Sequence, residues 1–478
     1  MNTLASPRPV ELYMTFSPSR IREYAVLLFE LFTRLSFALV LFLSPFAYRT
    51  TLVERRIGNV YSSYTDFFIY PADYFIGACI FFGLIAVVFA GRGIRRGPWY
   101  LTYPLCLIIV LSWGGMFSGI DSQLTAYHSL RLTLLFGLYF VLVNVPMSPR
   151  WVGLALAVGV MVQGIVAFGQ FQQQHSLGLY DWGELMLDPM QTGPSIVRDG
   201  TLRVLRVYGL TDHPNLLGGF FTFALILILG YYFAAAHSRA RYLLLVPIAV
   251  GSTALVFTFS RAAWLGLAAG VLFLGFCLWK SRSERARRLV PATVVAIVLA
   301  AAVLMPAYAN RNLIAQRAGQ EDSFVQNSGE ARSLDERDAL IESSTRIFVK
   351  HAIMGVGNGA LPLAMYWLDA QFDQRYFYQP AHVVLLEVAT ELGIVGGILW
   401  LWLMIAPCLA LYANRRTLFA SPWLAAVGGA FLALTLIGFL DYYPWLLPLG
   451  RIMQWTTFGL LAQLLSARVT LKRSPAQE

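Results

Sequence analysis

The sequence predicts an all-α polytopic membrane protein with about twelve transmembrane helices and a large helical loop on the outer side of the membrane. Of its 478 residues, 57% are apolar (AVILMFWYC) and only 13% are charged, and the mean hydropathy is +0.60. A soluble domain carries about 25% charged residues, whereas lipid tolerates an apolar exterior and penalises charge. The same composition excludes disordered, collagen-like and disulfide-stabilised chains. The net charge of +10 does not indicate nucleic-acid binding, because the basic residues lie in short clusters between apolar stretches.

The transmembrane helices are predicted from apolar runs of about 20 residues, the length that crosses a bilayer. The first run begins near Tyr24 and has no cleavage site of small residues after it, so we interpret it as a retained signal-anchor helix. The twelve predicted spans cover approximately residues 24–47, 68–90, 98–120, 128–146, 151–173, 214–236, 241–259, 262–280, 288–307, 388–412, 420–440 and 444–467. Because their number is even, both termini are expected on the same side.

The basic residues predict which side that is. Seven clusters on alternate connections hold 19 of the 36 Lys and Arg residues, whereas the short opposite loops hold only Arg49, Arg55, Arg56 and Arg261. Cytoplasmic loops are enriched in Lys and Arg. We therefore expect both termini in the cytoplasm.

Two connections are too long to be simple turns, and both lie on the outer side. We expect residues 1–307 to hold the first nine transmembrane helices, with an outer loop over about 174–213. Residues 308–381 are expected to form an outer helical loop, and residues 382–478 the last three transmembrane helices. A long outer loop on such a scaffold is where chemistry is expected.

Some ionisable or metal-binding groups lie inside the predicted spans. Glu30 and Arg34 are four residues apart and can neutralise each other. Arg131 lies near the outer end of its span, close to His128, and Arg451 lies within the last span, so both are functional candidates. These groups do not form a chain of acids, and the spans show no paired helix breaks, so a transporter is possible but unsupported. No metal or redox spacing occurs around the four cysteines, Cys79, Cys106, Cys277 and Cys408.

The first candidate motif precedes the sixth predicted span. Arg203 and Arg206 are followed by Asp212-His213-Pro214-Asn215, which is typical of a helix start with an Asp or Thr cap and an early proline. Capping is therefore one interpretation of Asp212 and His213. The arginines lie where lipid phosphates meet the positive end of a helix dipole, which favours anion binding.

The second motif is the tight outer turn Phe259-Ser260-Arg261-Ala262-Ala263-Trp264-Leu265. Small residues beside Arg261 would allow an anionic headgroup to approach closely. Snorkelling of the arginine toward the interface is the alternative.

The third motif begins at the end of the long outer loop. His382 stands where the chain re-enters a helix, and a helix N-terminus disfavours the imidazolium, so a neutral ring that can accept a proton is expected. Glu387 and Glu391 are four residues apart, on a face roughly opposite His382. They are interpreted as anchors for the loop or as partners of a positive neighbour.

Taken with these motifs, the chain resembles the O-antigen ligases, within the superfamily of O-antigen polymerases and bacterial O-linked oligosaccharyltransferases. The ligase pattern Arg-x3-Leu is matched by Arg261 and Leu265. The pattern His-[Asn/Ser/Gln]-x9-Gly-x3-[Gly/Thr/Val] is matched by His382, Gly393 and Gly397, with Val383 departing from its second position.

The resemblance implies transfer of a glycan from undecaprenyl pyrophosphate to the lipid A core at the periplasmic face of the bacterial inner membrane. The partners are then the lipid-linked donor, the lipid A core acceptor and membrane lipid, with no nucleotide, no nucleic acid, no metal and no cofactor. On this hypothesis, arginines bind the diphosphate and a histidine takes the acceptor proton, with inversion of the anomeric carbon. The predicted catalytic residues are His382, Arg261 and Arg206, and the predicted substrate-binding residues are Arg203, His213, Asn215, Glu387 and Glu391.

Three alternatives remain open at this stage. An O-antigen polymerase would use a second lipid-linked glycan as acceptor, and an O-linked oligosaccharyltransferase would use a Ser or Thr of a protein. A lipid-linked glycan transporter would need a polar path through the bilayer and would not require His382.

Overall fold

The computed structural model describes residues 18–91, 93–199, 202–281, 285–317, 329–373 and 375–471, and in this part of the chain it confirms an all-α polytopic membrane protein. Within these described residues, ten helices are long and apolar enough to cross a membrane. Each of the twelve predicted spans overlaps a helix. The two that fall outside the ten are the 17-residue α16, which is short, and α18, which carries Arg451.

The helices that overlap the predicted spans are α1 (Pro18–Leu43), α3 (Pro71–Ala90), α4 (Trp99–Ser118), α5 (Ser122–Asn144), α6 (Pro149–Gln173), α7 (Pro214–Ala234), α8 (Leu245–Phe257), α9 (Arg261–Lys280), α10 (Arg285–Ala309), α14 (Val384–Ala413), α16 (Pro422–Gly438) and α18 (Pro448–Leu471). The other described helices are α2 (Ser62–Thr65), η1 (Tyr180–Trp182), η2 (Arg239–Leu244), α11 (Arg311–Arg317), α12 (Gly329–Lys350), α13 (Leu361–Leu368), α15 (Arg415–Ala420) and α17 (Tyr443–Leu446). Two antiparallel strand pairs complete the described fold: β1 (Thr50–Val53) with β2 (Phe67–Ile69), and β3 (Ile196–Asp199) with β4 (Leu202–Leu205).

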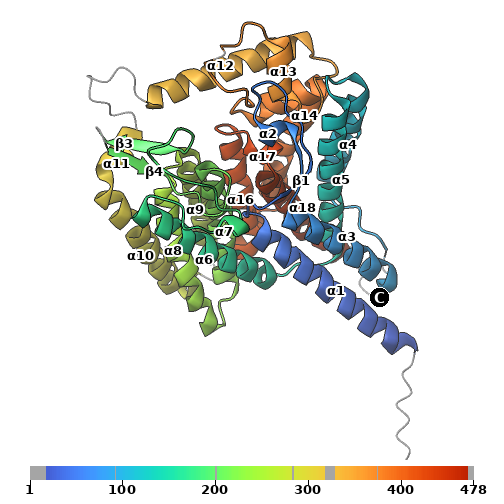
Figure 1. Ribbon diagram of the computed structural model, residues 1–478. Helices are drawn as coiled ribbons and strands as arrows, with labels where there is room; N and C mark the ends of the chain where they lie inside the picture. Colours follow the sequence, from blue (N-terminus) through green and yellow to red (C-terminus); the bar gives the residue numbers. More distant parts are fainter. Residues whose placement is uncertain are drawn as a thin grey trace, which may run out of the picture.

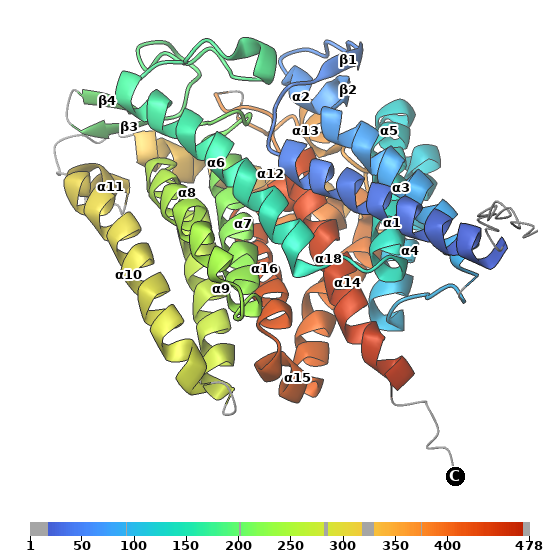
Figure 2. The ribbon, with the colours of Figure 1, turned by 90° about the horizontal axis from the view of Figure 1, so that it is seen from below.

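Helix α7 is the centre of the bundle. In the most apolar stretch of α7, 18 residues long, 94% is buried inside the protein. The helix packs against α6, α8, α9 and α16. Figure 2 shows α7 between α9 and α16, with α10 at the edge of the bundle. A helix that is apolar on all faces is expected in such a position. Residues at the start of α7 therefore meet several neighbouring elements.

The strand pairs and α11 lie together at one end of the membrane helices, and α15 lies at the opposite end (Figure 2). The segments between α1 and α3, between α6 and α7, and between α10 and α14 therefore share a face. Figure 1 shows α12 and α13 beside α2 at the edge of this face. An apolar cluster joins α12, α13, α5 and α17 through Leu340, Leu363, Leu124 and Leu446, so the long loop packs onto the ends of the membrane helices.

Several predicted span boundaries differ from the helix ends by four or more residues, and two of these differences have a clear local cause. Helix α5 begins at Ser122 because the Asp121 carboxylate accepts the backbone N–H of Leu124 at 2.9 Å. Helix α18 begins only at Pro448 because residues 443–446 form the separate turn α17.

Helix α14 is interrupted at Gly393, where the backbone adopts φ 76° and ψ 179°. The loop around residues 352–357 hydrogen-bonds to the backbone at this break: Val356 N donates to Thr390 O at 3.0 Å, and Ile394 N donates to Ala352 O at 2.7 Å. A Cβ at Gly393 would lie 2.2 Å from Ile353 O. The break therefore separates a short first half, residues 384–392, which we call the outer half after its predicted side, from the long membrane span.

Replacing Gly393 by alanine is expected to destabilise the protein, because only glycine readily adopts this conformation and a methyl group would meet backbone. We expect a cost of at least about 2 kcal/mol, measured as a lower thermal unfolding midpoint in detergent. The matched control is Gly275→Ala in α9, where a Cβ meets nothing within 4 Å. Equal midpoints for the two variants would contradict the role given to the break.

Candidate active site

Arg206 follows strand β4 and is 5% exposed. Its backbone N–H donates to Ser195 O at 3.1 Å, which holds it beside the residue that precedes β3. Its Nε donates to Thr258 O at 2.8 Å, and its Nη2 donates to Asn215 Oδ1 at 2.6 Å. The guanidinium therefore joins the outer loop, the end of α8 and the start of α7.

The start of α7 is at Pro214, as the sequence predicts, but the cap is neither Asp212 nor a threonine. The cap is His213, whose Nδ1 accepts the backbone N–H of Asn215 at 3.1 Å. Its Nε2 lies 3.1 Å from Ser195 Oγ. Asp212 instead pairs with Arg49 at 2.6 Å. Capping, one of the two interpretations of His213, is thus what the structure shows.

Asn215 connects Arg206 to the carboxylate of Asp441, in the turn between α16 and α17. Its Nδ2 donates to Asp441 Oδ2 at 2.8 Å. Asp441 is 3% exposed in the turn between α16 and α17, and its Oδ1 accepts the backbone N–H of Tyr442 at 2.9 Å. We call these three residues, Arg206, Asn215 and Asp441, the polar chain.

His382 lies two residues before α14 and contacts the turn that carries the polar chain. Its ring packs edge-on against Tyr442, with centroids 5.1 Å apart and an interplanar angle of 85°. Its Nδ1 is buried and has no hydrogen-bond partner within the described residues. Burial lowers the pKa of His382 to about 4; the Asp441 carboxylate opposes this effect and the Arg337 charge adds to it. The ring is therefore neutral at pH 7 and can accept a proton.

Arg261 is the first residue of α9 and is half-buried. The turn before it contains Thr258, whose carbonyl oxygen accepts from Arg206, so the two arginines belong to one corner of the fold. This corner is tightly packed against α7: a Cβ at Gly218 would lie 2.9 Å from the Cβ of Ala263 and 3.1 Å from that of Ser260. Glycine at that position is what lets α9 begin against the first turns of α7.

Arg203 lies elsewhere. It pairs with Arg198 across the β3–β4 ladder, and its Nη2 donates to Gln191 O at 3.2 Å. These contacts hold Arg203 within the loop between α6 and α7, and no hydrogen bond to the polar chain is among those of the described residues. The expected contribution of Arg203 to the donor site remains a prediction.

Glu387 and Glu391 are both fully buried on the short outer half of α14. Glu391 accepts from Trp445 Nε1 at 2.8 Å and from Leu361 N at 3.5 Å, so it anchors α13 and α17. Both carboxylate oxygens of Glu387 lack a hydrogen-bond partner among the residues described. The expected substrate-binding role of both residues remains a prediction.

Residues 244–401 match the family model described as O-antigen ligase. This segment is similar to the O-antigen ligases, and we refer to it as the ligase domain. The match confirms the predicted resemblance to the O-antigen ligases over these residues, and the ten apolar helices of the described chain indicate a multi-pass membrane protein. No curated protein matches the sequence.

The ligase domain contains two of the three predicted catalytic residues. Arg261 and His382 lie inside residues 244–401, whereas Arg206, Asn215 and Asp441 lie outside. The polar chain therefore joins segments on both sides of the domain to it. Asp441 was not predicted as a site residue. In the sequence, the signal for Asp441 is that a single carboxylate stands in a short turn between two apolar runs.

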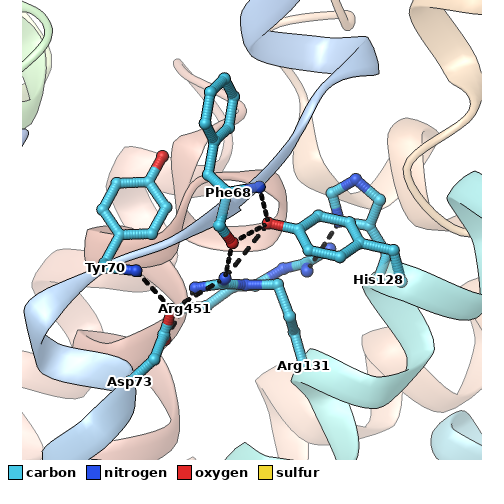
Figure 3. Close-up of polar contacts among 7 residues, drawn as sticks. Phe68, Tyr70, Asp73, His128, Arg131 and Arg451 are labelled. Carbon is cyan, nitrogen blue, oxygen red and sulfur yellow. Dashed lines mark hydrogen bonds and ion pairs between the residues drawn. The ribbon is translucent and has the colours of Figure 1, made fainter. Parts of the chain in front are cut away.

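A second polar network supports the ligase domain from the α5 side (Figure 3). Arg451 is 1% exposed; it donates to Trp445 O and to Asn358 Oδ1 (3.2 Å), and its Nη1 lies 3.1 Å from His128 Nδ1. These contacts tie α18 to α5, to the loop before α13 and to α17. Arg451 therefore fixes the turn that follows Asp441.

Arg131 lies beside this network, and its charge is paired with a carboxylate from another segment. It donates to both carboxylate oxygens of Asp73, at 3.0 and 2.9 Å, and to Phe68 O at 3.2 Å (Figure 3). Asp73 also accepts the backbone N–H of Tyr70 at 2.9 Å, at the start of α3. This buried ion pair holds the first outer segment against α5.

Among the described residues of the chain, no group of three or more His, Cys, Asp or Glu side chains could hold a metal ion. The four cysteines are not paired in disulfides. The candidate site of the ligase domain is thus built from arginine, amide, carboxylate and imidazole groups.

Proposed function

We propose that the protein is an O-antigen ligase that transfers a glycan from undecaprenyl pyrophosphate to the lipid A core oligosaccharide. The reaction takes place at the periplasmic face of the inner membrane, with both termini in the cytoplasm. It needs no metal ion and inverts the anomeric carbon. The observation that carries this proposal is the polar chain, which connects Arg206, at the corner that also holds Arg261, to the turn that contacts His382.

Arg206 and Arg261 are proposed to bind the diphosphate of the donor. A guanidinium stays charged and meets phosphate oxygens with two parallel hydrogen bonds. The starts of α7 and α9 meet at this corner, and the positive ends of the two helix dipoles add to the attraction for an anion. The charge that develops on the leaving group is thereby stabilised.

His382 is proposed to act as the general base. As the acceptor hydroxyl oxygen attacks the anomeric carbon, the bond from that carbon to the phosphate oxygen breaks and the hydroxyl proton passes to the imidazole. Undecaprenyl pyrophosphate leaves with the bonding electrons. The Asp441 carboxylate favours the imidazolium that forms, and the edge-on contact with Tyr442 orients the ring.

Reconstitution distinguishes this function from the alternatives. Purified protein is incorporated into vesicles with lipid-linked glycan and lipid A core, without nucleotide and with a metal chelator. Glycan attached to the core is the expected product. Longer lipid-linked chains would instead show a polymerase, glycan on an added acceptor protein would show an oligosaccharyltransferase, and movement of the donor across the bilayer without transfer would show a transporter.

The pH dependence of transfer follows from the lowered pKa of His382. The ring is a base only when it is neutral, so activity is expected to persist from pH 7 down to about 5 and to fall through pH 4 as the ring gains its proton. The measurement is kcat/KM against pH in reconstituted vesicles. An acid limb centred at 6.5, the ordinary value for histidine, would contradict burial of this base.

Asp441→Asn is expected to change both the rate and this profile. Asp441 raises the pKa of His382, so removing its charge moves the acid limb to lower pH. It also removes stabilisation of the imidazolium, and we expect kcat to fall about tenfold or more. The matched control is Asp338→Asn, an exposed carboxylate on α12. A variant with unchanged kcat and an unmoved limb would show that Asp441 does not act on His382.

A further inference from the structure

Aromatic side chains form a continuous path from the surface of the outer loops to the candidate base. Phe377 and Tyr61 pack with their rings tilted by 36° and their centroids 4.9 Å apart, and the Tyr61 and Tyr64 ring centroids are 6.4 Å apart. Tyr64 contacts Tyr442 at 6.4 Å, and Tyr442 contacts His382 at 5.1 Å. We call Phe377, Tyr61, Tyr64 and Tyr442 the aromatic ladder.

The two ends of the ladder differ in exposure. Phe377 is 52% exposed and Tyr61 is 44% exposed, although they come from loops more than 300 residues apart. Tyr64 is buried, and its hydroxyl oxygen lies 2.7 Å from that of Tyr442. The hydrogen-bonded inner pair therefore fixes the position of the exposed outer pair relative to His382.

Exposed aromatic rings outside the membrane often mark a binding surface, because their apolar faces lose contact with water when a ligand covers them. Polar groups lie beside the outer pair here. Glu336 Oε1 accepts from Gln379 Nε2 at 3.1 Å and from the backbone N–H of Phe377 at 3.5 Å. Partial burial raises the pKa of the Tyr61 phenol, and the negative charge of Glu336 raises it further.

This combination of groups fits one chemical class of ligand. A pyranose ring presents apolar C–H faces, which pack on aromatic rings, and hydroxyl groups, which hydrogen-bond to carboxylates and amides. A purely lipid ligand would use the rings but not Glu336 and Gln379. An anionic ligand would be repelled by Glu336.

We propose that Phe377 and Tyr61 form a platform for a sugar ring of the acceptor oligosaccharide, whose reacting hydroxyl then reaches His382. This inference rests on the proposed transfer reaction, because it is the acceptor that gives its proton to the base at the inner end of the ladder. The buried inner pair, Tyr64 and Tyr442, sets the distance between platform and base. The platform therefore selects the acceptor sugar that reacts.

Initial rates in reconstituted vesicles test the platform, with lipid A core and lipid-linked donor varied separately. Tyr61→Ala and Phe377→Ala are each expected to raise the KM for lipid A core about tenfold, with kcat and the donor KM unchanged. Tyr61→Phe keeps the ring face and is expected to retain most of the affinity. The control is Trp367→Ala, an aromatic residue of α13 that is 48% exposed and is not a rung of the ladder. An unchanged acceptor KM, or a rise in the donor KM alone, would overturn the proposal.

A direct binding measurement separates this inference from the proposed function. Core oligosaccharide released from lipid A is titrated against detergent-solubilised protein, with and without Tyr61→Ala. If wild-type protein transfers glycan but the variant binds the oligosaccharide equally well, the platform is wrong and the ligase function stands. If wild-type protein transfers nothing but the variant loses oligosaccharide binding, the platform stands and the ligase function is wrong.

Discussion

His382→Ala is expected to abolish transfer of glycan to the lipid A core without preventing folding or membrane insertion. The ring makes one aromatic contact, with Tyr442, and its Nδ1 has no hydrogen-bond partner in the described chain, so its removal breaks few interactions. Loss of a general base typically costs about 10²- to 10⁴-fold in rate. Core-linked product is measured by gel electrophoresis after reconstitution, with protein amount and thermal midpoint measured in parallel.

The matched control for this variant is His237→Ala, which removes an exposed histidine from the connection after α7 and is expected to leave transfer unchanged. If core-linked glycan still forms at a normal rate with His382→Ala, the base lies elsewhere. His213 would be the next candidate, although its ring caps α7 through Nδ1.

Arg261→Lys is expected to lose most activity even though the positive charge is kept. An ammonium group cannot form the paired, coplanar hydrogen bonds that a guanidinium makes with two phosphate oxygens. We expect kcat/KM for the donor to fall about 100-fold, the size seen when one donor to a developing anion is removed. Rates at varied donor concentration measure the effect.

Arg198→Lys is the control for this second variant, because Arg198 is exposed on β3 and carries the same charge at the same end of the molecule. A near-normal rate for Arg261→Lys would remove the argument for bidentate binding and leave only a point charge at the corner. A similar loss in both variants would show that the effect does not depend on the place of Arg261 at the corner.

Hydropathy was sufficient to place the membrane helices, because an apolar run of sufficient length has few alternatives in a chain with so few charges. The start of α7 was predictable for a related reason: Pro214 preceded by short polar residues permits little else than a helix N-terminus. The identity of the cap was not predictable. His213 takes that place because Asp212 is drawn to Arg49, which is 163 residues away in the sequence.

The parts of the candidate site that escaped prediction depend on contacts between distant segments. Asp441 joins the polar chain through its hydrogen bond with Asn215, which lies 226 residues earlier in the sequence. Arg451 contacts His128, which lies 323 residues earlier. The loop at residues 352–357 stabilises the break in α14 at Gly393. The sequence does not distinguish this glycine from other glycines in apolar runs. Such pairings leave no periodic signal along a single sequence.

The most direct test of the account is an experimental structure of the protein with undecaprenyl pyrophosphate bound in a lipid nanodisc. We expect the diphosphate oxygens within about 3 Å of guanidinium nitrogens of both Arg206 and Arg261, with the His382 ring facing the side from which an acceptor hydroxyl would approach. A diphosphate bound away from both arginines, or well-packed protein between it and His382, would contradict the proposed active site.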